Sequence, residues 1–134
     1  MYRATLGRLQ STLGDDHRDA LIAANNFGLC LAEAGDGAAA VHVLEPALAR
    51  AVAAGFVSME PVFRRNLGTA LRGAGRLDDA ERQLLRSHEL SVARAEPVNA
   101  IKAASALADL YDARQQPAEA ARWRAAASTS PAGN

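Results

Sequence analysis

Residues of similar type recur at intervals of 40 along this 134-residue chain. Four such series keep the same step: Gly28, Gly68 and Ala108; Phe27, Leu67 and Leu107; Leu31, Leu71 and Tyr111; and Ala40, Ala80 and Ala120. A fixed period of about 20 to 50 residues is typical of solenoid proteins, in which each unit buries its apolar face only by stacking on its neighbours. The repeat therefore predicts a stack of similar units in place of one globular core.

The composition indicates that these units are helical. Apolar residues make up 49% of the chain but aromatic residues only 4%, so close packing between elements relies on small residues. A chain of this length is expected to form one domain. We therefore predict an all-α fold, a single domain over residues 1–134 with about seven helices arranged largely as antiparallel pairs.

Turn residues and apolar spacing divide the chain into segments. Leu6, Leu9 and Leu13 lie three and four residues apart and predict a first, unpaired helix over residues 2–14. Three helix pairs and a disordered polar tail are then expected: repeat 1 over 15–55, repeat 2 over 56–96, repeat 3 over 97–127 and the tail over 128–134. Pro46 falls inside the second helix of repeat 1 and should kink or shorten it. The interpretations are a bend that follows the stack or an opened recognition surface near Phe56.

One run of residues carries a family resemblance. Phe27-Gly28, Leu31, Gly35 and Ala40 resemble the pattern of the tetratricopeptide repeat. The step of 40 is longer than the roughly 34 residues usual for that family and resembles its kinesin-light-chain-like variant, whose Asn-Asn-Leu-Ala stretch is similar to Asn25-Asn26-Phe27-Gly28. The resemblance implies a right-handed superhelix with a concave groove, lined by the first helix of each pair, that holds a peptide or helix of a partner protein.

The third repeat departs from the pattern of the first two. Ala106 stands where they have Asn26 and Asn66, Gln115 where they have Gly35 and Gly75, and Arg124 where they have Leu44 and Leu84. A polar residue on the last helix suits a capping unit, because the outer face of that helix meets water. The other interpretation is that repeat 3 has lost its binding residues.

The groove residues are expected at three- and four-residue spacing on the first helices, opposite the packing stripe. This places Asn25, Asn26, Leu29, Arg65, Asn66, Thr69, Arg72, Lys102 and Asp109 in the partner-binding groove, with Ser105 and Asp112 beside them. A carboxamide both donates and accepts hydrogen bonds, so Asn26 and Asn66, one repeat apart, are suited to holding a peptide main chain. The alternative is that the asparagines cap or bridge neighbouring helices.

Arg65 and Arg72 lie two helical turns apart and are suited to bidentate contact with a carboxylate or an acidic peptide side chain. Asp109 and Asp112 occupy comparable positions one repeat on, so the alternative is that these arginines and aspartates form lateral ion pairs. The set does not match the family's carboxylate clamp, because Leu29 and Asp109 interrupt it.

Several classes of function are not favoured by the sequence. The net charge is zero, so no nucleic-acid or membrane partner is expected. No apolar run approaches the roughly 18 residues of a membrane span. A lone Cys30 fits a reducing compartment, and we expect a cytoplasmic protein in which this cysteine is buried. His17, His42 and His88 show no metal-ligand spacing, so we predict no enzyme, no catalytic residue, no cofactor and no metal.

The leading functional hypothesis is a protein–protein interaction module or scaffold. The alternative is a regulatory or sensory segment of a larger bacterial transcriptional or signalling regulator, since the chain starts in mid-repeat. A weak homodimer formed through Leu6, Leu9 and Leu13 is a third possibility, because an unpaired helix exposes apolar surface.

Overall fold

The computed structural model describes residues 18–128, and this part of the chain is all-α, as the sequence predicts. Its elements are α2 (Arg18–Glu33), α3 (Gly37–Ala53), the short 3₁₀ helix η1 (Val57–Met59), α4 (Glu60–Gly73), α5 (Leu77–Ala93), α6 (Pro97–Ala113) and α7 (Pro117–Ser128). The predicted helix over 2–14 lies outside the described residues, as does the predicted tail from residue 129 onward. Ser128 ends α7 and is not part of a tail.

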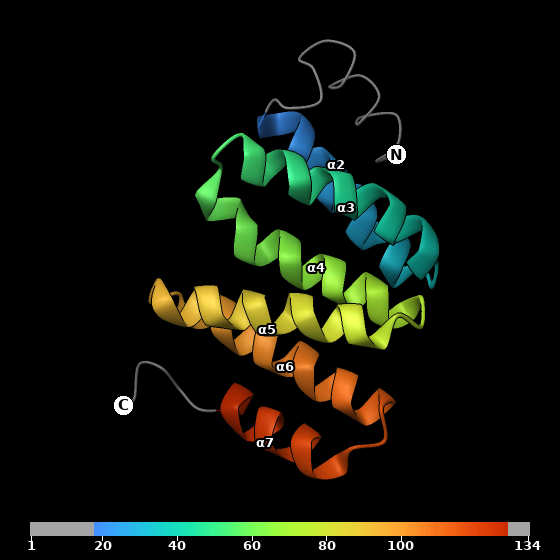
Figure 1. Ribbon diagram of the computed structural model, residues 1–134, viewed down its shortest axis with the longest axis vertical. Helices are drawn as coiled ribbons and strands as arrows, with labels where there is room; N and C mark the ends of the chain where they lie inside the picture. Colours follow the sequence, from blue (N-terminus) through green and yellow to red (C-terminus); the bar gives the residue numbers. More distant parts are fainter. Residues whose placement is uncertain (1–17, 129–134) are drawn as a thin grey trace.

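The six α-helices pack antiparallel, each on the next, and follow one another along the long axis of the molecule (Figure 1). The first helices of the pairs also approach one another: Cα atoms of α2 and α4, and of α4 and α6, come within 8 Å. Within residues 18–128, no such approach joins α3 to α5 or α5 to α7. The first helices therefore form a tighter layer, which we call the inner helices.

The turns that end the helices share one geometry and recur every 20 residues. The same backbone bond closes each turn, from N–H to the carbonyl five residues earlier: Asp36 to Leu31, Phe56 to Ala51, Arg76 to Leu71, Glu96 to Ser91 and Gln116 to Tyr111. This bond is typical of the Schellman motif, in which the residue just past the helix end has a left-handed backbone conformation with positive φ. Gly35 and Gly75 take that conformation, with φ of 88° and 81°, and Gln115 takes it too, with φ of 59°. The missing glycine of repeat 3 therefore leaves the turn intact.

The recurring small residues lie where helices of one pair meet. Ala40, Ala80 and Ala120 are almost fully buried. A Cβ atom added to Gly28 would lie 2.4 Å from Cγ of Leu44, and one added to Gly68 would lie 2.6 Å from Cγ of Leu84. The glycines thus let a leucine of the second helix reach the backbone of the first.

Pro46 does not shorten the helix that contains it. Helix α3 has 17 residues, as do α5 and α6, and continues for seven residues beyond the proline to Ala53. The prediction of a shortened helix is wrong because Pro46 lies on the exposed side of α3. There its ring displaces no packed neighbour, and water can hydrate the carbonyl that loses its donor.

Candidate functional site

A hollow of about 320 Å³ lies on the inner helices, and its lining comes from α2, α4 and α6. We call it the inner groove; its lining residues are Leu29, Arg65, Asn66, Thr69, Lys102, Ser105, Ala106 and Asp109. Sequence spacing predicts every one of these positions except Ala106. Four other predicted residues, Asn25, Asn26, Arg72 and Asp112, do not line it.

Helix α6 shows how the fold presents this lining. Its packing stripe includes Ala103, Ala104 and Leu107, all buried against neighbouring helices. Lys102, Ser105 and Asp109 lie at three- and four-residue spacing between these positions and are exposed. The period of the helix therefore places one set in the core and the other in the groove.

Asn25 and Asn66 form a buried pair between α2 and α4. The side-chain amide of Asn66 donates to Oδ1 of Asn25 over 3.2 Å, and each residue is only 6% exposed. Asn26, which the 40-residue step aligns with Asn66, is exposed. The geometry favours the bridging interpretation of the asparagines, with Asn25 as the partner of Asn66.

Replacing Asn66 by leucine is expected to lower the free energy of unfolding by about 1–3 kcal/mol, because the buried amide of Asn25 loses its partner. In the double variant Asn25→Leu, Asn66→Leu, the free energy of unfolding should fall by less than the sum of the losses in the two single variants, because no unpaired amide remains. Urea denaturation followed by circular dichroism measures these differences. The exposed Asn26→Leu is the control, with an expected change below about 0.5 kcal/mol. Additive losses in the double variant would contradict the pairing.

Arg65 is a half-buried cation in the inner groove. Its Nη1 donates to Oδ1 of Asn99 on α6 over 3.4 Å, and Nδ2 of Asn99 donates to Oε1 of Glu96 over 3.1 Å. Burial lowers the pKa of the Arg65 guanidinium by withdrawing water from its charge. The group nevertheless remains protonated at neutral pH.

The lateral ion pairs considered from the sequence are not the pairs that form. Asp109 lies 3.6 Å from Arg124 of α7, and Asp112 accepts a hydrogen bond from the same guanidinium. Because helix α7 packs directly on α6, Arg124 lies close enough to pair with both carboxylates. Arg72 is half-buried on α4 and has no ion pair within residues 18–128.

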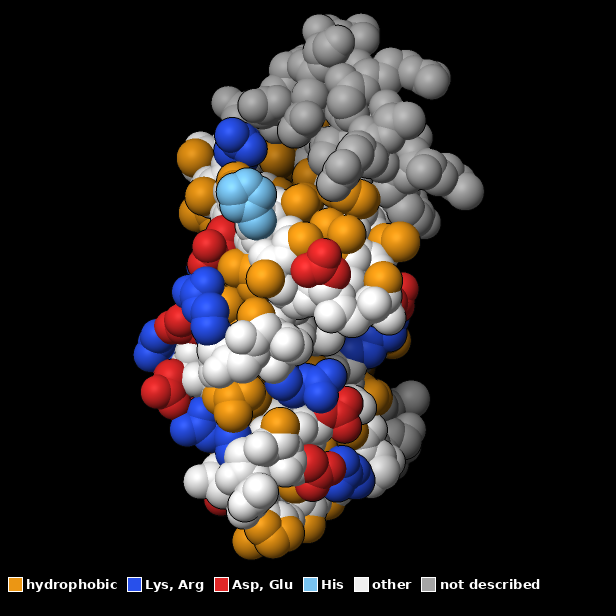
Figure 2. Space-filling view, turned by 90° about the vertical axis from the view of Figure 1, so that its right-hand side faces the viewer, with side chains coloured by type: hydrophobic (Ala, Val, Ile, Leu, Met, Phe, Trp, Pro, Cys, Tyr) orange, Lys and Arg blue, Asp and Glu red, His pale blue; other side chains and the backbone are white. Residues whose placement is uncertain are grey.

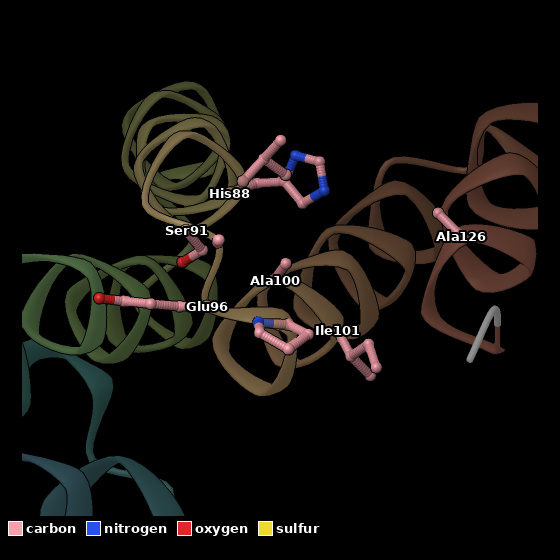
Figure 3. Close-up of a pocket in the computed structure, with 9 residues that line it drawn as sticks. His88, Ser91, Glu96, Ala100, Ile101 and Ala126 are labelled. Atoms are coloured by element: carbon pink, nitrogen blue, oxygen red, sulfur yellow. The ribbon is translucent and has the colours of Figure 1, made fainter. Parts of the chain in front are cut away.

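A second hollow, of about 450 Å³, lies where α5 ends, α6 begins and α7 ends (Figure 3). We call it the edge pocket; its lining residues are His88, Ser91, Val92, Ala95, Glu96, Pro97, Ala100, Ile101 and Ala126. The rings of His88 and Trp123 pack edge to face, and their centroids lie 4.9 Å apart. Burial lowers the pKa of His88, which is therefore neutral at pH 7. No motif in the sequence marked this pocket, because its lining is mostly small or aliphatic.

Cys30 is exposed on α2, so the prediction that it is buried is wrong. The buried stripe of α2 includes Leu21, Ala24 and Gly28, and residue 30 lies two positions, about 200°, around the helix from Gly28. Within residues 18–128, no group of three or more His, Cys, Asp or Glu side chains is placed to hold a metal ion.

Charges of both signs alternate on the molecular surface. Figure 2 shows Lys and Arg side chains beside Asp and Glu side chains on one face. Ion pairs at the surface are common among the described residues; in one of them, Nη2 of Arg114 lies 2.9 Å from Oδ1 of Asp78. Each such pair contributes about 1 kcal/mol or less to the stability of the fold. None of the helices in residues 18–128 combines the length and the apolar character needed to cross a membrane.

Known protein families and curated proteins give no match to this chain: no family model fits it, and the search of curated proteins finds no similar sequence. One fold can carry many functions, and the chemistry of the site residues distinguishes among them.

Proposed function

We propose that this chain is an interaction module of the tetratricopeptide type, in the kinesin-light-chain-like variant, coiled as a right-handed superhelix. In this proposal the inner groove binds a peptide or helix of a partner protein. The antiparallel helix pairs and the turns that recur every 20 residues support the architecture. The closer approach of the inner helices supports a concave face on their side.

One observation supports the binding role above all: equivalent positions of three repeats line one groove. Leu29, Thr69 and Asp109 are 40 residues apart in sequence, yet they lie around the same hollow. A ligand in the groove would therefore touch three helices at once. This arrangement suits a chain segment laid across the inner helices, with successive side chains read by successive repeats.

The chemistry of the lining suits a peptide. The hydroxyl groups of Thr69 and Ser105 can donate to and accept from a peptide main chain, and Leu29 offers an apolar contact. A volume of about 320 Å³ lies near the lower end of the range for ligand sites and accommodates a few side chains. We propose no catalytic role, metal or cofactor.

The proposed compartment is the cytoplasm, where the exposed thiol of Cys30 would stay reduced. A second proposal places the same groove in a regulatory or sensory segment of a larger bacterial regulator. Weak self-association is favoured by one feature of the described surface: Val92, which lines the edge pocket, is 59% exposed.

The proposed function is tested by selecting peptides from a displayed random library on the purified chain. Wild-type protein is expected to enrich peptides. Ser105→Tyr, which fills the groove from an exposed position, should weaken the enriched peptides about tenfold or more. Ala49→Tyr, at an exposed position on α3, is the matched control and should bind as wild type does. The proposal fails if nothing is enriched or if Ser105→Tyr binds equally well.

A further inference from the structure

In the second helix pair, the end of α5 covers the start of α4 and the η1 helix before it. The hydroxyl group of Ser87 donates to the carbonyl oxygen of Pro61 over 2.7 Å. Nη1 of Arg94 donates to the carbonyl oxygen of Val57, also over 2.7 Å. These contacts close the junction between the two helices, and Pro61 is fully buried.

The third pair has other residues at these positions. The step of 40 places Ala127 where the second pair has Ser87, and Asn134 where it has Arg94. Ala127 has no hydroxyl group, and Asn134 lies outside the described residues. Ile101, the equivalent of Pro61, is half-buried and lines the edge pocket. The edge pocket therefore lies, one repeat on, at the place where α5 covers α4.

The lining of the edge pocket is apolar, with one polar group that a ligand can reach. Ser91 is fully buried, and its hydroxyl group already donates to the carbonyl oxygen of Ser87 over 2.8 Å. The imidazole of His88 borders the same space as Ala100 and Ile101 (Figure 3). A neutral imidazole has one nitrogen that donates a hydrogen bond and one that accepts. His88 is thus the lining residue suited to hydrogen-bonding a ligand.

The edge pocket offers no charge to an ionised ligand. Its lining includes no Lys or Arg, and its one ionised side chain is Glu96. The carboxylate of Glu96 accepts a hydrogen bond from Nδ2 of Asn99 over 3.1 Å, and it points away from Ile101 and Ala126 (Figure 3). Burying a charge without a partner costs free energy. The pocket therefore suits an uncharged molecule.

We infer that the edge pocket binds a small, uncharged and mainly apolar molecule, with one hydroxyl or amide group hydrogen-bonded to His88. Its volume of about 450 Å³ lies within the range of roughly 300–1,000 Å³ that is usual for small-molecule sites. A small molecule is favoured over a protein partner because 9 residues line the pocket, fewer than the roughly 20–30 that each side of a stable protein interface contributes. The inference does not depend on peptide binding in the inner groove.

The test uses benzyl alcohol as the probe, together with three analogues of similar size. Toluene lacks the hydroxyl group, and benzoate and benzylammonium are charged. Binding is measured from amide chemical shifts in NMR spectra and from the fluorescence of Trp123, the single tryptophan of the chain, which packs on His88. Benzyl alcohol is expected to bind saturably and to shift the resonances of the lining residues. Toluene should bind about three- to tenfold more weakly, and the two charged analogues about tenfold or more.

Three variants test the location of the site. Ala126→Phe fills the pocket from an exposed position on α7 and should weaken benzyl alcohol about tenfold or more. Ala121→Phe, at an exposed position of the same helix that does not line the pocket, is the matched control and should bind as wild type does. His88→Leu should abolish the preference for benzyl alcohol over toluene. Ser105→Tyr, which fills the inner groove, should leave probe binding unchanged.

Several results would overturn the inference. They are the absence of saturable binding to the wild-type chain, equal binding by Ala126→Phe, tighter binding of either charged analogue, and a preference for benzyl alcohol that survives in His88→Leu. Light scattering tests the other occupant, a second copy of the chain. A dimer that Ala126→Phe dissociates, in a protein that binds none of the probes, would assign the pocket to self-association and also overturn the inference.

Discussion

Gly37→Ala is expected to lower the free energy of unfolding by about 3 kcal/mol, a large effect for the addition of one methyl group. A Cβ atom at this position would lie 2.6 Å from the backbone nitrogen of Ala74, 2.7 Å from the carbonyl carbon of Gly73 and 2.8 Å from the carbonyl oxygen of Ala70. These are backbone atoms at the end of α4, so no side-chain rotation relieves the overlap. The start of α3 must move away from α4, which separates the first helix pair from the second.

Gly73→Ala is the matched control for this prediction. Among residues 18–128, its added Cβ would find only the Cα atom of Gly37, at 3.7 Å, which is an ordinary contact. We expect no loss of stability from this change, because alanine is also the better helix former. Urea denaturation followed by circular dichroism compares the two variants. Equal stability of Gly37→Ala and wild type would show that the junction between α3 and α4 tolerates a side chain.

Leu84→Ala is expected to lower the free energy of unfolding by about 2–5 kcal/mol, because this leucine is fully buried and its loss leaves a cavity. Gly68→Ala alone should cost about 1–3 kcal/mol, since its methyl group overlaps Cγ of Leu84 at 2.6 Å. In the double variant the new methyl group occupies space that the leucine vacated. The combined loss should therefore be smaller than the sum by about 1 kcal/mol or more.

The same denaturation measurement on the four proteins of this cycle gives the coupling directly. Gly28 and Leu44 make the equivalent contact in the first pair, with 2.4 Å to Cγ, so they provide an independent replicate. Strictly additive losses in both pairs would show that the glycine and the leucine do not share space.

The third helix pair has other residues at the two positions where the first two pairs have a glycine in contact with a leucine. Ala108 replaces the glycine, and the position of the leucine is taken by Arg124, which is 54% exposed and contacts Asp109 and Asp112. Helix α7 accordingly has Ala120 as its single buried residue among those described. The second helix of the last pair therefore presents a charged side chain at the position where the first two pairs bury a leucine.

The sequence predicted the fold class and most of the residues that line the groove, because both follow from the spacing of apolar and polar residues along each helix. Apolar spacing of three and four residues predicted helices throughout the part of the chain that the structure describes, and six α-helices are found there. The same spacing placed Leu29, Thr69 and Asp109 opposite the packing stripe, and these residues line the inner groove. No partner residue needs to be known for such an inference, since a helix fixes which of its own side chains share a face.

Only the tertiary structure decided which faces meet and which charges pair. The pattern aligned Asn26 with Asn66, but the crossing of α2 and α4 brings Asn25 to Asn66. Asp109 contacts Arg124 of the next helix, and Arg65 has no carboxylate within 4 Å among residues 18–128. The sequence fixes the order of side chains around each helix, whereas the rotation and approach of neighbouring helices depend on close contacts such as those at Gly37 and Gly68. Those contacts join residues far apart in the chain, and no local pattern specifies them.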